Sequence, residues 1–520
     1  MASNISDIKA AVHKRKTAAS VAGSSVIAQG TPPDVPDSAF VRNCINAGEL
    51  GLGMLLAALL RHKYIYIPNW DQWLVWDKTH WRLDELNELC ADVELVLTQA
   101  IQDEICNLAS EQAGADEDEA EKLSAIIKRA YRCIKHLRNV AGRNNAVTMA
   151  RSCPSSLAVS ANYLDLKPTL LACANAVIDL ETGRAKDARR DYYLTMASPV
   201  EWRGIDAPAP AFDKFIHEIY NGDEELVEYI QRMFGYAASG LCLEQFFPIL
   251  WGKGRNGKGT LINIIKHVMG PMASAVQSEM LLDQFGKRSS AGPSGDIKAL
   301  KGLRMAFGSE LDAGKRLSQA RIKWLTGDDE LVARAPYDKI ETRWKPTHTL
   351  FLLTNPKPNI LGGDYGFAKR LHFIPHRLSF VYDEPKQAFE RKAVKGLGES
   401  IIREEASGVL AWLVRGFMDW VKKGGLMPPD SVTSATQDYL LSEDVIGQFI
   451  DDCLIDDPSA WEPATDVYNA FVSWYVKNCG EEKDVLSQHK FGKIFSDRYE
   501  RKKVGSYRYI GIRLKYSILD

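Results

Sequence analysis

The sequence of 520 residues lacks the patterns that indicate a metal- or disulfide-based fold. Its nine cysteines include no Cys-x-x-Cys pair and no Cys/His cluster at zinc-binding spacing. Scattered cysteines of this kind are typical of reduced, mostly buried thiols in a cytosol-type compartment. We therefore predict neither a zinc site nor a disulfide framework, and we expect a cytoplasmic protein.

The sequence also lacks a long apolar run and an excess of charge of either sign. The longest apolar run, "LGLGMLLAALL", covers residues 50–60, which is about half the length that a bilayer requires. The net charge of -2 excludes a histone-like polycation but not a local basic patch. Residues 1–40 are polar and rich in Ser, Gly and Pro, and we expect them to form a disordered lead-in.

Composition divides the rest of the chain into four parts. Residues 41–240 predict a mainly helical, mixed α/β domain, in which the acidic insert at 111–122 is expected to be a solvated loop. Residues 241–385 alternate apolar strands with helices, which indicates a parallel sheet in an α/β nucleotide-binding core. Residues 386–430 form a helical connector. Residues 431–520 read as three helices and a hairpin, the pattern of a winged helix.

The segment "GKGRNGKGT" predicts a phosphate-binding loop. It fits G-x-x-x-x-G-K and lies between an apolar strand and a helix. Its glycines let successive backbone N–H groups face the phosphates, and Lys258 supplies a positive charge. The alternative is a glycine-rich turn with an exposed lysine. The expected nucleotide-binding residues are Gly252, Gly254, Asn256, Gly257, Lys258, Gly259 and Thr260.

The position after Lys258 lacks the hydroxyl group that usually ligates Mg²⁺. Gly259 occupies this position, and Thr260 follows it. One residue along a helix is a rotation of about 100°. Either the geometry of the loop therefore brings Thr260 round to the ion, or a water molecule takes that place in the magnesium shell.

The next two predicted strands end in polar residues. Glu310 and Asp312 follow "LRMAFGS", and Asn355 follows "TLFLLT". A carboxylate at such a strand end can polarise a water and help to hold Mg²⁺. Glu310 is the better placed, whereas Asp312 suits a structural or second-shell role, and both join Thr260 as candidate metal ligands. Asn355 either contacts the water or the γ-phosphate, or is a turn residue before proline.

Basic residues mark two further places. Arg370 follows Lys369 just before a predicted strand, where an arginine can reach the phosphate of a neighbouring subunit; the alternative is a surface basic pair. In the C-terminal hairpin, Lys502, Lys503 and Arg508 are expected to contact DNA, unless the hairpin is solvated and its tyrosines pack inward. The four tryptophans between residues 70 and 81 are expected in the core.

The order of these motifs resembles a known family. "GKGRNGKGT", "RLSQARIKWLTGDDELVAR", "TNPKP" and "DYGFAKR" follow one another as in the superfamily 3 helicases, the AAA+ motors of viral, phage and plasmid replication. The likeness is greatest to primase-helicases of the poxvirus type. It implies an α/β fold with an AAA+ P-loop ATPase core, a mainly helical N-terminal domain and a winged-helix-like C-terminal domain.

The resemblance also assigns roles. It implies a hexameric ring that hydrolyses ATP, with Mg²⁺, between subunits. By this likeness, Lys258 and Glu310 would be the Walker A and Walker B residues. Asn355 would be the sensor of the γ-phosphate. Arg370 would be the arginine finger, which contacts the nucleotide of a neighbouring subunit.

Residues 331–346 would form a β-hairpin in the central channel. By this likeness, the hairpin tip carries Lys339, and Lys323 and Arg334 lie on its approach, all three as DNA contacts. Only about 40 residues precede the similar region, so we expect priming activity to come from a separate primase on another chain.

The leading hypothesis is an ATP-dependent replicative helicase of a phage, prophage or plasmid in the bacterial cytoplasm. It would act on single-stranded or forked DNA together with other replication proteins. An alternative is a nucleotide-stabilised, origin-binding initiator or scaffold without strong unwinding, which Gly259 and Ser309 favour because both weaken the expected magnesium ligation. A small-molecule kinase is poorly supported, since it leaves the hairpin and the basic tail without a role.

Overall fold

The chain forms two compact units in the computed structural model, which describes residues 35–283, 294–309, 315–336, 341–360, 365–479 and 485–515. The first unit extends to Ala209 and adds the segments Lys266–Met272 and Glu405–Gly425. The second comprises Pro210–Ile265, Ala273–Glu404 and the chain from Leu426 onward. This division is coarser than the predicted five parts, whose boundaries stay a prediction. Within the described ranges, no helix combines the length and apolarity needed to cross a membrane.

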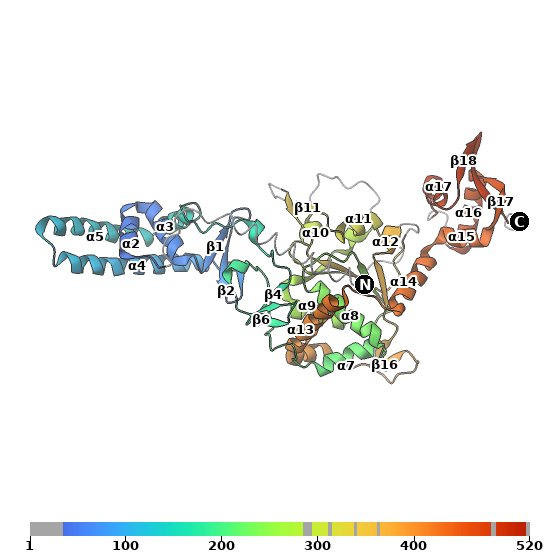
Figure 1. Ribbon diagram of the computed structural model, residues 1–520, viewed down its shortest axis with the longest axis horizontal. Helices are drawn as coiled ribbons and strands as arrows, with labels where there is room; N and C mark the ends of the chain where they lie inside the picture. The colour runs from blue at the N-terminus through green and yellow to red at the C-terminus, as the bar shows by residue number, and fades with distance from the viewer. Residues whose placement is uncertain are drawn as a thin grey trace. The chain divides into compact units, whose positions relative to one another are not determined.

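Helices dominate the beginning of the first unit, where α4 and α5 run antiparallel as a long hairpin (Figure 1). The α4 side chains Val93, Leu97 and Ile101 recur every four residues and are fully buried in a shared apolar core. The expected loop at 111–122 is wrong for most of its length, because α5 begins at Glu117, where the side chain of Asp116 caps it. The helices are α2 (Ser38–Asn46), α3 (Gly48–Leu60), α4 (Glu88–Gln112), α5 (Glu117–Leu137) and α6 (Val140–Ala150).

Two small sheets complete the first unit. One is antiparallel in the order β1-β2-β3, and the other has the order β6-β5-β4-β7. Trp81 is buried as predicted, but Trp70 is 37% exposed, so the prediction of a core position is wrong for Trp70. The strands are β1 (Tyr64–Ile67), β2 (Gln72–Asp77), β3 (His80–Leu83), β4 (Leu170–Cys173), β5 (Val177–Asp179), β6 (Arg184–Lys186) and β7 (Ala197–Ser198), with 3-10 turns η1 (Ala161–Tyr163), η2 (Arg190–Tyr192) and η3 (Gly270–Met272).

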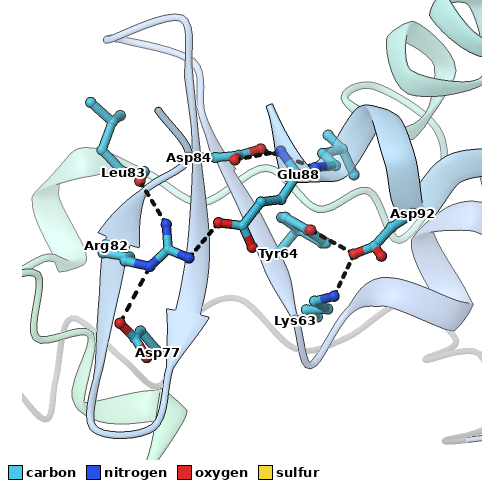
Figure 2. A network of polar contacts seen from close by, with 9 residues as sticks. Lys63, Tyr64, Asp77, Arg82, Leu83, Asp84, Glu88 and Asp92 are labelled. Carbon is cyan, nitrogen blue, oxygen red and sulfur yellow. Dashed lines mark hydrogen bonds and ion pairs between the residues drawn. The ribbon is translucent and has the colours of Figure 1, made fainter. Parts of the chain in front are cut away.

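A polar network joins the first of these sheets to the start of α4 (Figure 2). The carboxylate of Asp84 accepts the backbone N–H of Glu88 at 2.8 Å and so satisfies a free donor of the first helical turn. The guanidinium of Arg82 donates to the side chain of Glu88. One turn further along, Asp92 accepts the hydroxyl of Tyr64 at 2.6 Å. These contacts fix where the helical hairpin leaves the sheet.

A five-stranded parallel sheet forms the centre of the second unit. Its order is β14-β8-β13-β10-β9, and its strands are largely buried. The predicted α/β core with a parallel sheet is therefore confirmed. Because β8 and β13 are neighbours, the residues that follow them emerge at the same edge of the sheet. The strands are β8 (Phe247–Trp251), β9 (Ala273–Val276), β10 (Met305–Ser309), β13 (Thr349–Thr354) and β14 (Leu371–Pro375).

Helices and two short strand pairs surround this sheet. Strands β11 (Leu331–Ala333) and β12 (Thr342–Trp344) pair antiparallel, as expected for the hairpin over 331–346, but its tip residue Lys339 lies outside the described residues. Strands β15 (Ser379–Val381) and β16 (Glu390–Lys392) pair in parallel. The helices are α7 (Pro210–Ile219), α8 (Glu224–Ala237), α9 (Lys258–Met269), α10 (Gly295–Lys298), α11 (Gln319–Leu325), α12 (Tyr365–Ala368), α13 (Leu397–Lys423) and α14 (Asp430–Glu443), with the 3-10 turn η4 (Ser278–Leu281).

The C-terminal domain, defined here as residues 445–515, has the predicted three helices and hairpin. Its antiparallel sheet has the order β17-β19-β18. Phe449, Phe471, Phe491 and Tyr509 form its buried aromatic core. The elements are α15 (Val445–Cys453), β17 (Leu454–Pro463), α16 (Ala464–Asn478), α17 (Gln488–Ser496), β18 (Arg501–Val504) and β19 (Ser506–Leu514). Whether this domain works as a winged helix stays a prediction.

Candidate nucleotide site

The predicted phosphate loop lies between β8 and α9, and its shape depends on glycine at two positions. A Cβ on Gly252 would lie 2.0 Å from the side-chain nitrogen of Asn256. Gly257 has a φ of 80°, and a Cβ there would lie 2.5 Å from Cγ2 of Ile219 in α7. A side chain at either position would clash with these neighbours. Glycine is therefore required for the tight turn of the loop and for its close approach to α7.

Lys258 is held inside this loop. It is the first residue of α9 and is only 6% exposed. Its ammonium group donates to the carbonyl oxygen of Gly252 at 2.8 Å and to the side-chain oxygen of Asn355 at 3.3 Å. Burial lowers the pKa of Lys258 to about 8, because a charge that leaves water is destabilised. A negatively charged ligand at this place would favour the charged form and raise this pKa again.

Asn355 reaches Lys258 because of the sheet order. It follows β13, whose Thr354 pairs with Trp251 at the end of β8. The structure therefore brings together the predicted phosphate-binding lysine and the predicted sensor. The simpler alternative of a turn residue is compatible with the same position, so the sensor role stays a prediction.

The two residues after Lys258 differ in their surroundings. A Cβ on Gly259 would meet no atom within 4 Å, so this position is open. Thr260 is half-buried, and its methyl carbon would lie 3.1 Å from a Cβ on Gly398 in α13. Thr260 also lines a cavity of about 480 Å³ beside the loop.

The walls of this cavity come from several elements that are distant in the sequence. Phe215 belongs to α7, Phe380 to β15 and Glu399 to α13, and Arg255 of the loop completes the wall beside Thr260. The backbone carbonyl of Arg255 accepts the N–H of Phe380 at 2.6 Å, which ties β15 to the loop. The sequence analysis missed these wall residues because they share no motif and lie up to 184 residues apart (Phe215 to Glu399).

The acidic candidates cannot be placed. Glu310 and Asp312 lie outside the described residues, although β10, which ends just before them at Ser309, lies beside β13 in the sheet. In the parts of the chain that the structure describes, no group of three or more His, Cys, Asp or Glu residues forms a metal-binding cluster. The magnesium roles of Thr260, Glu310 and Asp312 stay predictions.

The chain is similar to several known proteins. Residues 53–221 match the family described as "D5 N terminal like". The chain is 28% identical over 398 residues to "Putative helicase L207/L206" of Acanthamoeba polyphaga mimivirus, covering 72% of this chain and 40% of that protein. It is 22% identical over 336 residues to "Putative primase C962R" of African swine fever virus, covering 62% and 35%. These matches support the interpretation of the chain as a primase-helicase of the superfamily 3 type.

Other similarities have a narrower extent. "Putative helicase 022R" of Frog virus 3 is 26% identical over 239 residues, which is 44% of this chain and 24% of that protein. The chain thus spans less than half the length of each of these relatives. The solved C-terminal region of NrS-1 aligns with 58% of this chain and 65% of its own at 14% identity and a TM-score of 0.36. The phage or plasmid source and the separate primase stay predictions.

Arg370 forms hydrogen bonds within its own chain. Its guanidinium donates to the carbonyl of Lys323 at 2.5 Å, to the hydroxyl of Thr326 at 3.1 Å and to the side chain of Gln245 at 2.5 Å. These bonds tie β14 to the end of α11. A finger role would require the guanidinium to exchange these partners for a phosphate, and it stays a prediction.

The predicted DNA contacts lie apart from the nucleotide site. Lys323 belongs to α11, and Arg334 directly follows β11. Lys502 and Lys503 are exposed on β18, and Lys502 forms an ion pair of 3.2 Å with Glu500.

Aromatic partners of the C-terminal basic residues were missed by the sequence analysis. The guanidinium of Arg508 lies 3.6 Å from the ring centre of Trp461, which is 46% exposed. The guanidinium of Arg501 lies 3.9 Å from the ring of Tyr507. Tyr509 packs inside, whereas Tyr507 is 48% exposed, so inward packing holds for Tyr509 alone of these two, and the DNA contacts of the hairpin stay a prediction.

Proposed function

We propose that this chain is the ATP-driven motor of a replicative DNA helicase from a phage, prophage or plasmid. The observation that carries the proposal is the position of Lys258, buried between the carbonyl of Gly252 and the side chain of Asn355 at the edge of a parallel sheet. A buried ammonium with neutral acceptors is suited to receive a phosphate group. Names of the mimivirus and Frog virus 3 relatives point in the same direction.

The surrounding fold supports an AAA+ type of P-loop ATPase. The strand that precedes the loop, β8, lies between β14 and β13, and β10 and β9 follow. ATP would place its phosphates on residues 252–260, and its base and ribose would occupy the cavity lined by Phe215, Thr260 and Phe380. Bound Mg²⁺ would neutralise charge on the phosphates. The open position at Gly259 leaves room for a water in its shell, and Thr260, Glu310 or Asp312 are the candidate protein ligands.

The motor would act on DNA as a homo-oligomeric ring, with six subunits as the expected number. Arg370 would then give up its hydrogen bonds within the chain and bind the phosphate of the nucleotide held by a neighbouring subunit. The hairpin formed by β11 and β12 would carry Lys339 into the channel and move one strand of the DNA. Lys502 and Lys503 of the C-terminal domain would add phosphate contacts.

The deciding experiment measures ATP turnover and unwinding of forked DNA. Lys258→Ala should abolish both, because it removes the charge that meets the phosphates, while the oligomeric state stays unchanged. Lys253→Ala is the matched control, since Lys253 is an exposed lysine of the same loop. Equal ATP turnover in wild type and Lys258→Ala would refute the proposal.

A second candidate is an origin-binding initiator or scaffold that uses nucleotide only to stabilise a ring. The bonds of Arg370 to Thr326 and Gln245 favour it, because a guanidinium held in the chain does not stabilise a transition state next door. The missing hydroxyl at Gly259 points the same way. Nucleotide-dependent assembly without DNA-stimulated turnover would support this candidate, and steady DNA-stimulated turnover would exclude it.

A further inference from the structure

Helix α14 holds the short segment that carries Asn355. This segment, residues 355–360, leaves the sheet after β13. The hydroxyl of Tyr439 in α14 donates to the backbone carbonyl of Pro358. One turn later, the carboxylate of Glu443 accepts the backbone N–H of Ile360 at 3.3 Å. Two side chains of one helix thus fix two points of the segment.

Tyr439 is itself firmly placed. Its side chain is fully buried, and its ring stacks on Phe373 of β14 with 4.5 Å between the ring centres. The hydroxyl of Thr436, one turn earlier in α14, accepts the backbone N–H of Phe373 at 2.9 Å. Burial raises the pKa of Tyr439, so the phenol keeps its proton and remains a donor.

The backbone between Asn355 and Pro358, whose carbonyl accepts the hydroxyl of Tyr439, has little conformational freedom. Pro356 and Pro358 lie within it, and a proline ring fixes φ near −65°. The hydroxyl of Thr354 also donates to the carbonyl of Pro356 at 2.7 Å. A displacement at Pro358 is therefore passed along the backbone to Asn355 rather than absorbed by free rotation.

The far end of α14 leads into the C-terminal domain. Asp444 directly follows α14 and caps α15 by accepting the backbone N–H of Gly447 at 3.0 Å. Its carboxylate also accepts the guanidinium of Arg498, with distances of 2.8 and 2.7 Å to its two oxygens. Arg498 lies just after α17, so the C-terminal domain is held at the very end of the helix that fixes residues 355–360.

We propose that Tyr439 is a positioning residue for ATP turnover, and that α14 transmits the state of the C-terminal domain to Asn355. Tyr439 acts through Pro358 and keeps Asn355 within reach of Lys258. When DNA binds the C-terminal domain, it shifts the position of α14. This shift moves residues 355–360 and therefore Asn355. This inference rests on the proposed ATPase function.

The first test is Tyr439→Phe, which removes one hydroxyl and keeps the stacked ring. We expect kcat for ATP to fall about fivefold while KM stays within twofold, because Asn355 is misplaced but the phosphate loop is intact. Tyr468→Phe is the matched control: the hydroxyl of Tyr468 donates to a backbone carbonyl, that of Leu486, at 3.0 Å within the C-terminal domain. It should lower the melting temperature similarly and leave basal kcat unchanged.

A second variant covers the case in which Tyr439→Phe fails to fold. Pro356→Ala loosens the segment and retains every hydrogen bond described above, and it should also lower kcat without a change in KM. The transmission is tested with Arg498→Met, which frees Asp444. Basal turnover should persist, whereas stimulation by forked DNA should fall at least threefold.

The outcomes separate the two proposals. If wild-type protein shows no turnover, the proposed function is wrong and this inference falls with it. If wild-type protein turns over ATP and both Tyr439→Phe and Pro356→Ala keep wild-type kcat, the positioning role alone is refuted. If Arg498→Met retains full stimulation by DNA, α14 does not transmit the state of the C-terminal domain.

Discussion

The ammonium nitrogen of Lys258 lies 3.3 Å from the side-chain oxygen of Asn355, although 97 residues separate them in the sequence. Parallel pairing of β8 with β13 produces this contact, because both residues leave the sheet at its carboxyl edge. Since Lys258 is 6% exposed, an arriving phosphate would compete with Asn355 for a cation that has little access to water. Asn355 is therefore placed to respond when that phosphate arrives or leaves.

Nucleotide binding should take up protons in mildly alkaline solution. The pKa of Lys258 is lowered to about 8 by burial, and a bound phosphate favours the charged form. We expect the affinity for ADP to weaken as the pH rises above about 8. Calorimetry at about pH 8.5 in two buffers with different ionisation enthalpies should show uptake of a fraction of a proton. Lys258→Arg, which stays charged, should show none.

The same shift has a consequence for the unliganded fold. The unfolded chain holds the proton of Lys258 more tightly than the folded chain, because the pKa falls from 10.5 to about 8 on folding. The contribution of this group to the free energy of unfolding therefore rises with pH between those two values. If the enthalpy of ADP binding at about pH 8.5 does not depend on the buffer, the pKa of Lys258 is not lowered, and both predictions are wrong.

A hydroxyl restored at residue 259 should strengthen magnesium binding. A Cβ there would meet no atom within 4 Å, so Gly259→Ser should fold normally and lower the Mg²⁺ concentration for half-maximal turnover severalfold. Thr260→Val should leave that concentration within about twofold, because Thr260 lines the adjacent cavity. A large increase for Thr260→Val would instead show that Thr260 supplies the ligand.

Removal of the Arg370 side chain should affect both stability and catalysis. Three hydrogen bonds are lost within the chain, so Arg370→Ala should lower the free energy of unfolding by about 1–3 kcal/mol in denaturant titrations. Its ATP turnover should also fall. Lys369→Ala, at the exposed neighbouring position, should change neither quantity appreciably.

Mixed assemblies separate the two roles of Arg370. If it acts in trans, a mixture of Arg370→Ala with Lys258→Ala should turn over more ATP than the two pure variants, because some interfaces regain both groups. Turnover that only follows the fraction of each variant would contradict a finger in trans and leave the in-chain bonds as its role.

Loss of two lysines from β18 should weaken DNA binding in a salt-dependent way. Lys502 and Lys503 are exposed, and each phosphate contact contributes about 0.9 to the slope of log affinity against log salt for duplex DNA. The double alanine variant should lower that slope by about 2. The double variant Lys122→Ala/Lys128→Ala removes the same charge from exposed sites on α5 and should leave the slope unchanged. Equal effects of both would refute a specific site on β18.

Local pattern was sufficient to predict the parallel sheet and the glycine-rich turn between β8 and α9, whereas phosphate binding at that turn stays a prediction. The loop is recognisable because its glycines and Lys258 are contiguous and lie between an apolar strand and a helix. The pattern was less informative for charge runs: residues from Glu117 onward read as solvated loop, yet Asp116 caps a helix there whose apolar face packs on α4. Trp70 was misplaced because an aromatic residue carries no signal for which face of the turn it occupies.

Contacts between segments that are distant in the sequence could not be predicted from the sequence. The partners of Arg370 lie 44 to 125 residues away, and no sequence motif links them to it. The hydrogen bond from Tyr439 to the carbonyl of Pro358 joins residues that are 81 positions apart, and no sequence motif predicts it. Such contacts depend on the order of strands and the docking of helices, which single-residue patterns do not encode.

The approach of Ile219 to Gly257 extends the nucleotide site towards the N-terminus. Because α7 lies against the loop and Phe215 lines the cavity, a truncated chain that starts at the first strand of the sheet, at residue 247, would lose one wall of the site and expose apolar side chains to water. The shortest piece expected to retain nucleotide in a dialysis experiment therefore starts at Pro210, where the second unit begins.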